Sequence, residues 1–169
     1  MKKLKNKKAV IVIILMLLLV VAYLFYSRSM TIQQRYPMLK LDKCTEIRGY
    51  YATGEHTALT KFTIDRNSKV FETLCSLLYA QDYRRSLRDL LPRGTRIHAT
   101  APEDFEWDVC FYFEEVMLSD GTIVSGEILR IQYWYGELDI YFDGEILSCH
   151  TNEQEAWAKE VLNAILSGD

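Results

Sequence analysis

The stretch "EILRIQYWYGELDIYFDG", residues 127–144, decides the fold class of this chain. Apolar and polar residues alternate on both sides of Gly136-Glu137, a pair that suits a two-residue hairpin turn with glycine first. One side of the resulting hairpin is apolar, because this turn places Tyr133 opposite Ile140. The stretch therefore predicts two antiparallel strands with one face in a core.

The other side of this hairpin is predicted to be polar. Its cross-strand pairs in this register are Trp134 with Asp139, Gln132 with Tyr141, and Arg130 with Asp143. The last of these pairs joins opposite charges. Trp134 and Tyr141 beside polar groups suit stacking on a sugar ring or contact with a protein partner. We take both as candidate binding residues; the alternative is that a helix or the N-terminal hairpin covers this face.

Further strands are predicted on both sides of the hairpin. In "WDVCFYFEE", residues 107–115, every second residue is apolar. Asp120-Gly121 and Asp143-Gly144 are strong turn signals. Together these segments predict a meander of about four antiparallel strands.

Helices and a second hairpin complete the expected domain. Residues 47–64, "IRGYYATGEHTALTKFTI", suggest two short strands around a central turn. A helix capped by Asp65 should run through Tyr79, and a final helix should begin at Thr151 or Asn152. The buried stripe of the final helix is predicted to be Trp157, Val161, Ala164 and Ile165. The expected fold class is α+β, with a mostly antiparallel sheet and two main helices on one face.

The N-terminus predicts a membrane anchor. Residues 1–8 carry five lysines, and residues 9–26 form an uncharged apolar run. Eighteen helical residues span about 27 Å, close to the roughly 30 Å hydrocarbon core of a bilayer. A cleaved signal peptide is the alternative, but its apolar core is usually shorter, about 7–15 residues. The lysine excess favours a cytoplasmic tail (1–8), a transmembrane anchor (9–26), a tether (27–43) and an extracytoplasmic domain (44–169).

The charge of the exported part argues against a nucleic-acid partner. The whole chain has a net charge of −3, but residues 30–169 hold 14 basic and 23 acidic residues. A domain with a charge of −9 is repelled by phosphate backbones. No P-loop or GxGxxG motif is present, and the spacing of cysteine and histidine residues does not suggest a metal site or a cofactor.

The four cysteines allow two interpretations. Cys44, Cys75, Cys110 and Cys149 all lie in the exported part. Outside the cytoplasm they can form up to two disulfides, with three possible connectivities. As free thiols they would be small buried hydrophobic residues.

Half of the ten arginines lie between residues 84 and 96. They are Arg84, Arg85, Arg88, Arg93 and Arg96. They form a candidate site for an anion or a surface contact. The alternative is internal pairing, because residues 97–169 hold 16 acidic and only two basic residues. Charge balance favours internal pairing with those carboxylates.

Several segments resemble a group of bacterial proteins. The segments are "RRSLRDLLPRGTRIHA", "EWDVCFYFEEV", "LSDGTIVSGEILRIQYWYGELDIYFDG" and "EQEAWAKEVLNAIL". They resemble uncharacterised membrane-anchored proteins of clostridia-type Gram-positive bacteria. The resemblance covers roughly half of the chain and implies an exported, anchored domain. It implies no activity or cofactor.

The sequence favours a non-catalytic binding or accessory module at the cell envelope, with an envelope protein or a glycan as partner. Two alternatives remain: a hydrolase of wall polymer, and a structural subunit of a membrane complex. An acid/base pair for a hydrolase could come from Glu103, Asp104, Glu106 and Asp108. A solvated loop and strand edge is the more common setting for such residues. A cleft holding two carboxylates, one with a raised pKa, would favour the enzyme.

Overall fold

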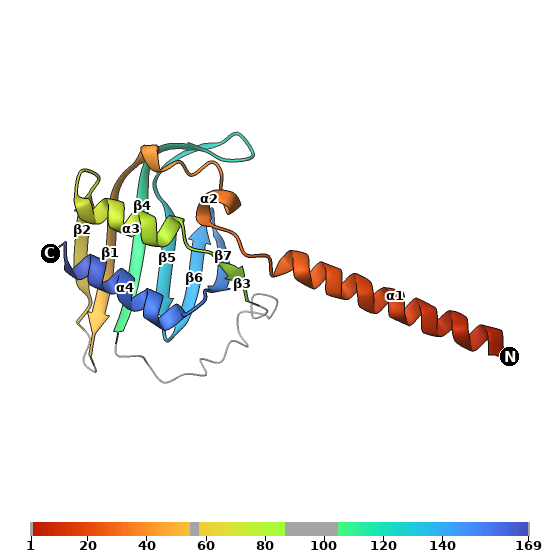
Figure 1. Ribbon diagram of the computed structural model, residues 1–169. Helices are drawn as coiled ribbons and strands as arrows, with labels where there is room; N and C mark the ends of the chain where they lie inside the picture. The colour runs from red at the N-terminus through yellow and green to blue at the C-terminus, as the bar shows by residue number, and fades with distance from the viewer. Residues whose placement is uncertain (1, 55–57, 87–104, 169) are drawn as a thin grey trace.

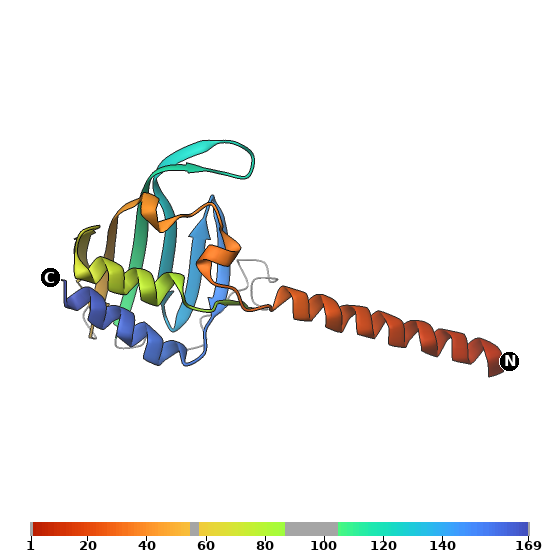
Figure 2. The same cartoon turned by 45° about the horizontal axis from the view of Figure 1, so that its top comes forward.

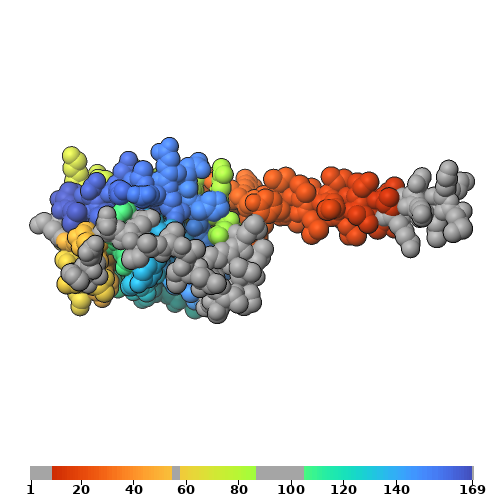
Figure 3. Space-filling model, turned by 90° about the horizontal axis from the view of Figure 1, so that it is seen from below, coloured from red at the N-terminus to blue at the C-terminus, as the bar shows by residue number. Residues whose placement is uncertain are grey.

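The computed structural model consists of a long N-terminal helix and one α+β domain (Figure 1). It describes residues 2–54, 58–86 and 105–168. Helix α1 (Lys2–Tyr26) contains the apolar segment Ala9–Tyr26, which has a mean hydropathy of 3.1 and is not buried by the rest of the chain. Figure 3 shows α1 leaving the domain as a bare rod. Among the described residues, α1 is the one helix long and apolar enough to cross a membrane, as the sequence predicts.

The domain is built on one antiparallel sheet. Its strands are β1 (Cys44–Thr53), β2 (Thr60–Asp65), β3 (Arg84–Arg85), β4 (Phe105–Met117), β5 (Ile123–Trp134), β6 (Glu137–Phe142) and β7 (Glu145–His150). The order across the sheet is β2-β1-β4-β5-β6-β7-β3. Strands β1 and β2 form the expected hairpin, and β4 to β7 form the expected meander. The predicted fold class is confirmed.

Two helices cover one face of this sheet. Figures 1 and 2 show α3 (Lys69–Tyr79) and α4 (Gln154–Leu166) side by side in front of the strands. The predicted stripe of α4 is buried, and so is the apolar alternation of β4. Two core indoles meet edge to face, because the rings of Trp107 and Trp157 have centroids 5.6 Å apart. Their N–H groups donate to the backbone oxygens of Ala158 (3.0 Å) and Leu77 (3.2 Å), so both indoles are satisfied inside the core.

The register of the β5–β6 hairpin differs from the prediction by two residues. The turn is Tyr135-Gly136 rather than Gly136-Glu137, and Trp134 pairs with Glu137. Both turn residues have positive φ, 52° and 73°, which is the conformation of a type I′ turn. This turn matches the twist of the strands, with glycine in the second central position. Because the shift is even, every side chain keeps its predicted face.

The shifted register removes the expected pair between Arg130 and Asp143. Arg130 instead lies opposite Tyr141, and Gln132 lies opposite Asp139. Arg130 forms its ion pair on the other side, with Asp108 of β4. Arg130 therefore forms a cross-strand ion pair, as predicted, but its partner is Asp108 and not Asp143.

The starts of both covering helices also differ from the prediction. Helix α3 is capped by Ser68, whose hydroxyl accepts a hydrogen bond from the Phe71 amide at 3.1 Å, and not by Asp65. Helix α4 has Glu153 at its N-cap, with a φ of 49° and no side-chain cap. Part of the expected capping box remains, because the Thr151 amide donates to Oε1 of Gln154 at 3.3 Å.

Much of the predicted tether, 27–43, is packed against the domain. Met30 forms a β-bridge with Tyr83, and Ile32 and Leu39 are fully buried. This segment also holds the short helix α2 (Ile32–Arg35), which has a complete capping box, and the 3-10 helix η1 (Leu41–Lys43). The apolar residues of this segment, such as Ile32 and Leu39, follow no sustained helical or strand period, which is why the sequence suggests a link rather than packed chain. Residues 30–43 belong to the folded unit.

All four cysteines are buried and free. Burial raises the pKa of the Cys44 thiol to about 11 and that of Cys75 to about 12. Of the two interpretations, the structure has the four buried thiols.

Candidate functional site

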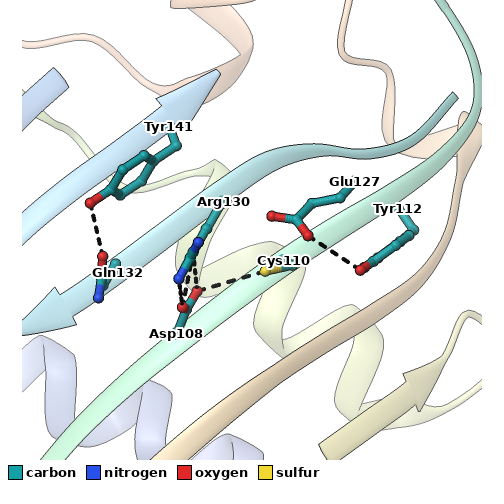
Figure 4. Close-up of polar contacts among 7 residues, drawn as sticks. All are labelled: Asp108, Cys110, Tyr112, Glu127, Arg130, Gln132 and Tyr141. Atoms are coloured by element: carbon teal, nitrogen blue, oxygen red, sulfur yellow. Dashed lines mark hydrogen bonds and ion pairs between the residues drawn. The ribbon is translucent and has the colours of Figure 1, made fainter. Parts of the chain in front are cut away.

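The face of the sheet opposite α3 and α4 is lined by polar and aromatic side chains, and we call it the polar face. On the central strands these residues alternate with the core residues Val109 and Ile131. Described residues of the polar face include Glu46, Arg48, Tyr50, Glu106, Asp108, Cys110, Tyr112, Glu127, Arg130, Gln132, Trp134, Glu137, Asp139 and Tyr141. Figure 4 shows the contacts at its centre.

An ion pair between Asp108 and Arg130 occupies the middle of the polar face (Figure 4). Asp108 is 5% exposed although it carries a charge. The Nε atom of Arg130 lies 2.9 Å from each carboxylate oxygen, and Nη2 also donates to Oδ2. These hydrogen bonds raise the pKa of the guanidinium. The pair satisfies the buried carboxylate and still leaves donors of the guanidinium for other acceptors.

Aromatic rings continue this pair along the face. The guanidinium of Arg130 lies 5.4 Å from the ring centroid of Tyr141, whose hydroxyl donates to Oε1 of Gln132 at 2.9 Å. Farther along β4, the Tyr112 hydroxyl donates to Glu127 at 3.3 Å, and Arg48 lies 4.7 Å from the Tyr112 ring. The polar face therefore presents rings and charges held in fixed positions by one another.

A pocket of about 160 Å³ opens beside the ion pair, and we call it the Trp134 pocket. It is lined by Tyr50, Leu59, Glu106, Trp107, Asp108, Arg130 and Trp134. The lining thus brings together three aromatic residues, two acidic residues and one arginine. Strands β1, β4 and β5 position them, because these strands are neighbours in the sheet.

Two groups in the Trp134 pocket have unusual surroundings. Burial raises the pKa of Glu106, and a hydrogen bond from the Tyr135 amide partly opposes this shift. The indole nitrogen of Trp134 is shielded from solvent and has no hydrogen-bond acceptor within the described part of the chain. A buried indole N–H usually has a partner, so the described residues leave this donor of a pocket-lining residue unsatisfied.

A larger and more open hollow of about 400 Å³ lies on the other side of Arg130. Its lining includes Tyr141 and Glu127, together with the apolar residues Val124 and Phe142. Arg130 lines both spaces, so the ion pair separates the two hollows.

Trp134 and Tyr141 both lie on the polar face, as predicted from the alternation. They are not adjacent, because Tyr141 pairs with Arg130, four residues before Trp134 on β5. Each aromatic residue instead lines a hollow that it shares with Arg130. The two main helices lie on the opposite face, so they do not cover these residues.

The arginine cluster lies elsewhere. Arg84 and Arg85 form β3, the edge strand beyond β7, several strands from the Trp134 pocket. Arg88, Arg93 and Arg96 lie outside the described residues. Neither Arg84 nor Arg85 forms an ion pair with a carboxylate among the described residues. Internal pairing is therefore not seen for these two and stays a prediction for the other three.

Sequence reasoning placed Glu106 and Asp108 on a solvated loop and strand edge, and the structure corrects this. Both lie on β4, a central strand between β1 and β5, with Glu106 partly buried and Asp108 buried. Glu103 and Asp104 lie outside the described residues. The sequence does contain a signal for this: Asp108 is the one charged residue in the stretch 107–113, and a charge at such a position needs a partner.

In the described part of the chain, no three His, Cys, Asp or Glu side chains gather as metal ligands would. No family model matches the chain, and neither the curated proteins nor the solved structures contain a match.

Proposed function

We propose that this protein is a single-pass, membrane-anchored binding module whose Trp134 pocket holds one sugar unit of a cell-envelope polymer. One observation carries the proposal: Trp134, whose indole nitrogen is buried without an acceptor among the described residues, lines the same pocket as Glu106 and Arg130. The domain acts on the extracytoplasmic side, and this orientation rests on the five lysines before the span.

The chemistry of the pocket suits a polyhydroxylated ring. Trp134 and Tyr50 offer apolar ring faces, which pack against the C–H face of a sugar. The carboxylates accept hydrogen bonds from hydroxyl groups, while the indole and Arg130 donate to ring or carbonyl oxygens. A long apolar peptide side chain would leave these polar groups unpaired, which is costly.

The size of the pocket points to one unit of a larger ligand. Its volume of about 160 Å³ is below the roughly 300–1,000 Å³ that holds a whole drug-sized molecule. The polar face beyond Arg130 gives the rest of a polymer room to lie along the sheet, past Tyr141.

A hydrolase is the second candidate, because the pocket holds two carboxylates and the pKa of one, Glu106, is raised. Glu106 would be the acid in such a reaction. The role of base or nucleophile is less suited to Asp108, because Arg130 donates to both of its oxygens. This engagement favours binding over hydrolysis.

The test uses the full chain in lipid nanodiscs, mixed with insoluble envelope polysaccharide and sedimented. We expect wild type to bind, and Trp134→Ala to weaken binding by roughly tenfold or more, as loss of a central aromatic contact does. Met117→Ala is the matched control, because Met117 is an exposed apolar residue outside the pocket. It should bind like wild type.

The same mixtures decide among the alternatives. Binding that survives protease treatment of the polysaccharide supports a glycan ligand, and binding lost after protease identifies a protein partner. Release of soluble sugar by wild type but not by Glu106→Gln would identify a hydrolase. No retention on any envelope fraction would refute the binding module.

A further inference from the structure

The end of α1 is joined to the strand that carries Arg84 and Arg85. Met30 and Tyr83 exchange backbone hydrogen bonds of 3.1 and 3.0 Å. The hydroxyl of Tyr26, the last residue of α1, donates to the backbone oxygen of Ser86 at 3.3 Å. The guanidinium of Arg85 lies 5.4 Å from the centre of the Tyr26 ring. These contacts fix β3 beside the exit of the helix (Figure 1).

This position corresponds to the headgroup layer of a bilayer. The 18 residues Ala9–Tyr26 span about 27 Å, which fills the roughly 30 Å hydrocarbon core and leaves Tyr26 at its edge. The polar layer beyond is about 5–7 Å thick. The guanidinium of Arg85 lies 5.4 Å from the Tyr26 ring, so Arg85 is at the same end of the span.

The basic groups at this position are not neutralised by the described part of the domain. Arg28 and Arg84 are exposed, and Arg85 is partly buried. None of the three pairs with a described carboxylate. The Nε atom of Arg85 is shielded from solvent and has no acceptor among the described residues. A desolvated donor of this kind needs an acceptor, and phosphate is a strong one for guanidinium.

We propose that Arg28, Arg84 and Arg85 bind the phosphates of anionic phospholipid headgroups where α1 leaves the bilayer. This inference rests on the anchoring part of the proposed function, and it is independent of the Trp134 pocket. The contacts would hold the domain in one orientation on the membrane, with the β3 edge of the sheet toward the lipid. Asp82, the exposed carboxylate next to Tyr83, forms no ion pair with a described arginine and only partly offsets the positive charge.

The experiment measures how fast each arginine of the wild-type full chain reacts with phenylglyoxal in nanodiscs, with sites resolved by mass spectrometry. One set of discs is zwitterionic phosphatidylcholine, and the other contains 30% phosphatidylglycerol. The attraction of one arginine to an anionic surface changes an equilibrium constant roughly fivefold. We therefore expect Arg28, Arg84 and Arg85 to react about fivefold more slowly in the anionic discs. Arg66 is the internal control, since it follows β2 at the opposite edge of the sheet.

Loss of this protection in 0.5 M sodium chloride would support an electrostatic contact with lipid. Equal rates in the two kinds of disc would overturn the proposal. Protection by 10 mM inorganic phosphate in zwitterionic discs would also overturn it, because the site would then serve a soluble anion. The polysaccharide assay tests Trp134, whereas the phenylglyoxal assay tests these arginines. A negative result in one assay therefore refutes one proposal and leaves the other standing. No variant is needed, so misfolding does not obscure the result.

Discussion

Replacing Arg130 with Met should destabilise the domain by breaking the ion pair at the centre of the polar face. The change removes the hydrogen bonds to Asp108, which is 5% exposed, and leaves this carboxylate without a charged partner. Hydrogen bonds to charged groups contribute about 1.5–3 kcal/mol each, so losing the two donor groups, Nε–H and Nη2–H, costs about 3–6 kcal/mol at most.

Two effects reduce this figure. An isolated buried carboxylate takes up a proton when keeping its charge becomes too costly. Protonating a carboxylate at pH 7 costs about 4 kcal/mol, so the loss of stability caused by the unpaired charge does not exceed that value. The side chain of Arg130 is 38% exposed, so solvent already weakens the wild-type pair. We expect Arg130→Met to lower the free energy of unfolding by about 2–4 kcal/mol at pH 7.

The matched variant Asp108→Asn should cost less, about 1–2 kcal/mol, because the charge it leaves unpaired on Arg130 can hydrate. Urea unfolding of the full chain in detergent, followed by tryptophan fluorescence, measures both variants. The penalty of Arg130→Met should also be smaller at pH 5 than at pH 7, because protonation then costs less. Equal penalties for the two variants, or a penalty that does not depend on pH, would refute this reasoning.

Three further predictions concern the core and the pocket. Gly49→Ala should destabilise the domain by about 3 kcal/mol, because a Cβ there lies 1.9 Å from the backbone oxygen of Asp108. Gly168→Ala, whose Cβ would come no closer than 3.2 Å to Val70, should cost much less in the same urea assay. Maleimide at pH 8 should label none of the four buried thiols in the native chain and all four in denaturant, counted by mass spectrometry; a pair that stays unlabelled after unfolding would indicate a disulfide. Burial raises the pKa of Glu106 above the ordinary value of about 4.3. Between the ordinary pKa and the raised pKa, the unfolded chain releases this proton more readily than the folded chain, so Glu106 should lower the stability of wild type as the pH rises between them. Glu106→Gln should lose less in urea titrations at pH 4.5 and pH 7, and identical pH dependence in both proteins would contradict the assignment.

Periodicity predicts the parts of this fold that depend on local pattern. The alternation in β4 and β5 places Trp107 and Tyr133 in the core and Trp134 on the polar face. The N-terminal apolar run is equally clear, because its eighteen uncharged residues form one helix long and apolar enough to cross a membrane.

The sequence is less informative where one residue acts against its usual preference. Tyr135 adopts a positive φ, which an aromatic residue seldom does, so the pattern favoured a turn one residue later. The packing of Ile32 depends on the bridge between Met30 and Tyr83, which are far apart in the chain. No local signal reports such a contact.

The candidate site was only partly predictable for the same reason. Trp134 follows from alternation, but the pair of Asp108 and Arg130 depends on the alignment of β4 with β5. The grouping of Arg84 and Arg85 suggested an anion site, yet it gave no indication that α1 ends beside them. That placement follows only from the folded chain.

The central claim, that the Trp134 pocket holds a sugar unit, is tested most directly by the indole N–H signals of the full chain labelled with ¹⁵N-tryptophan. Trp107 and Trp157 already donate to backbone oxygens, whereas Trp134 has no acceptor among the described residues. Adding soluble fragments of envelope polysaccharide should shift one signal, the one that is missing in Trp134→Phe, and leave the other two in place. Three unchanged signals, or a shift confined to Trp107 and Trp157, would contradict the account.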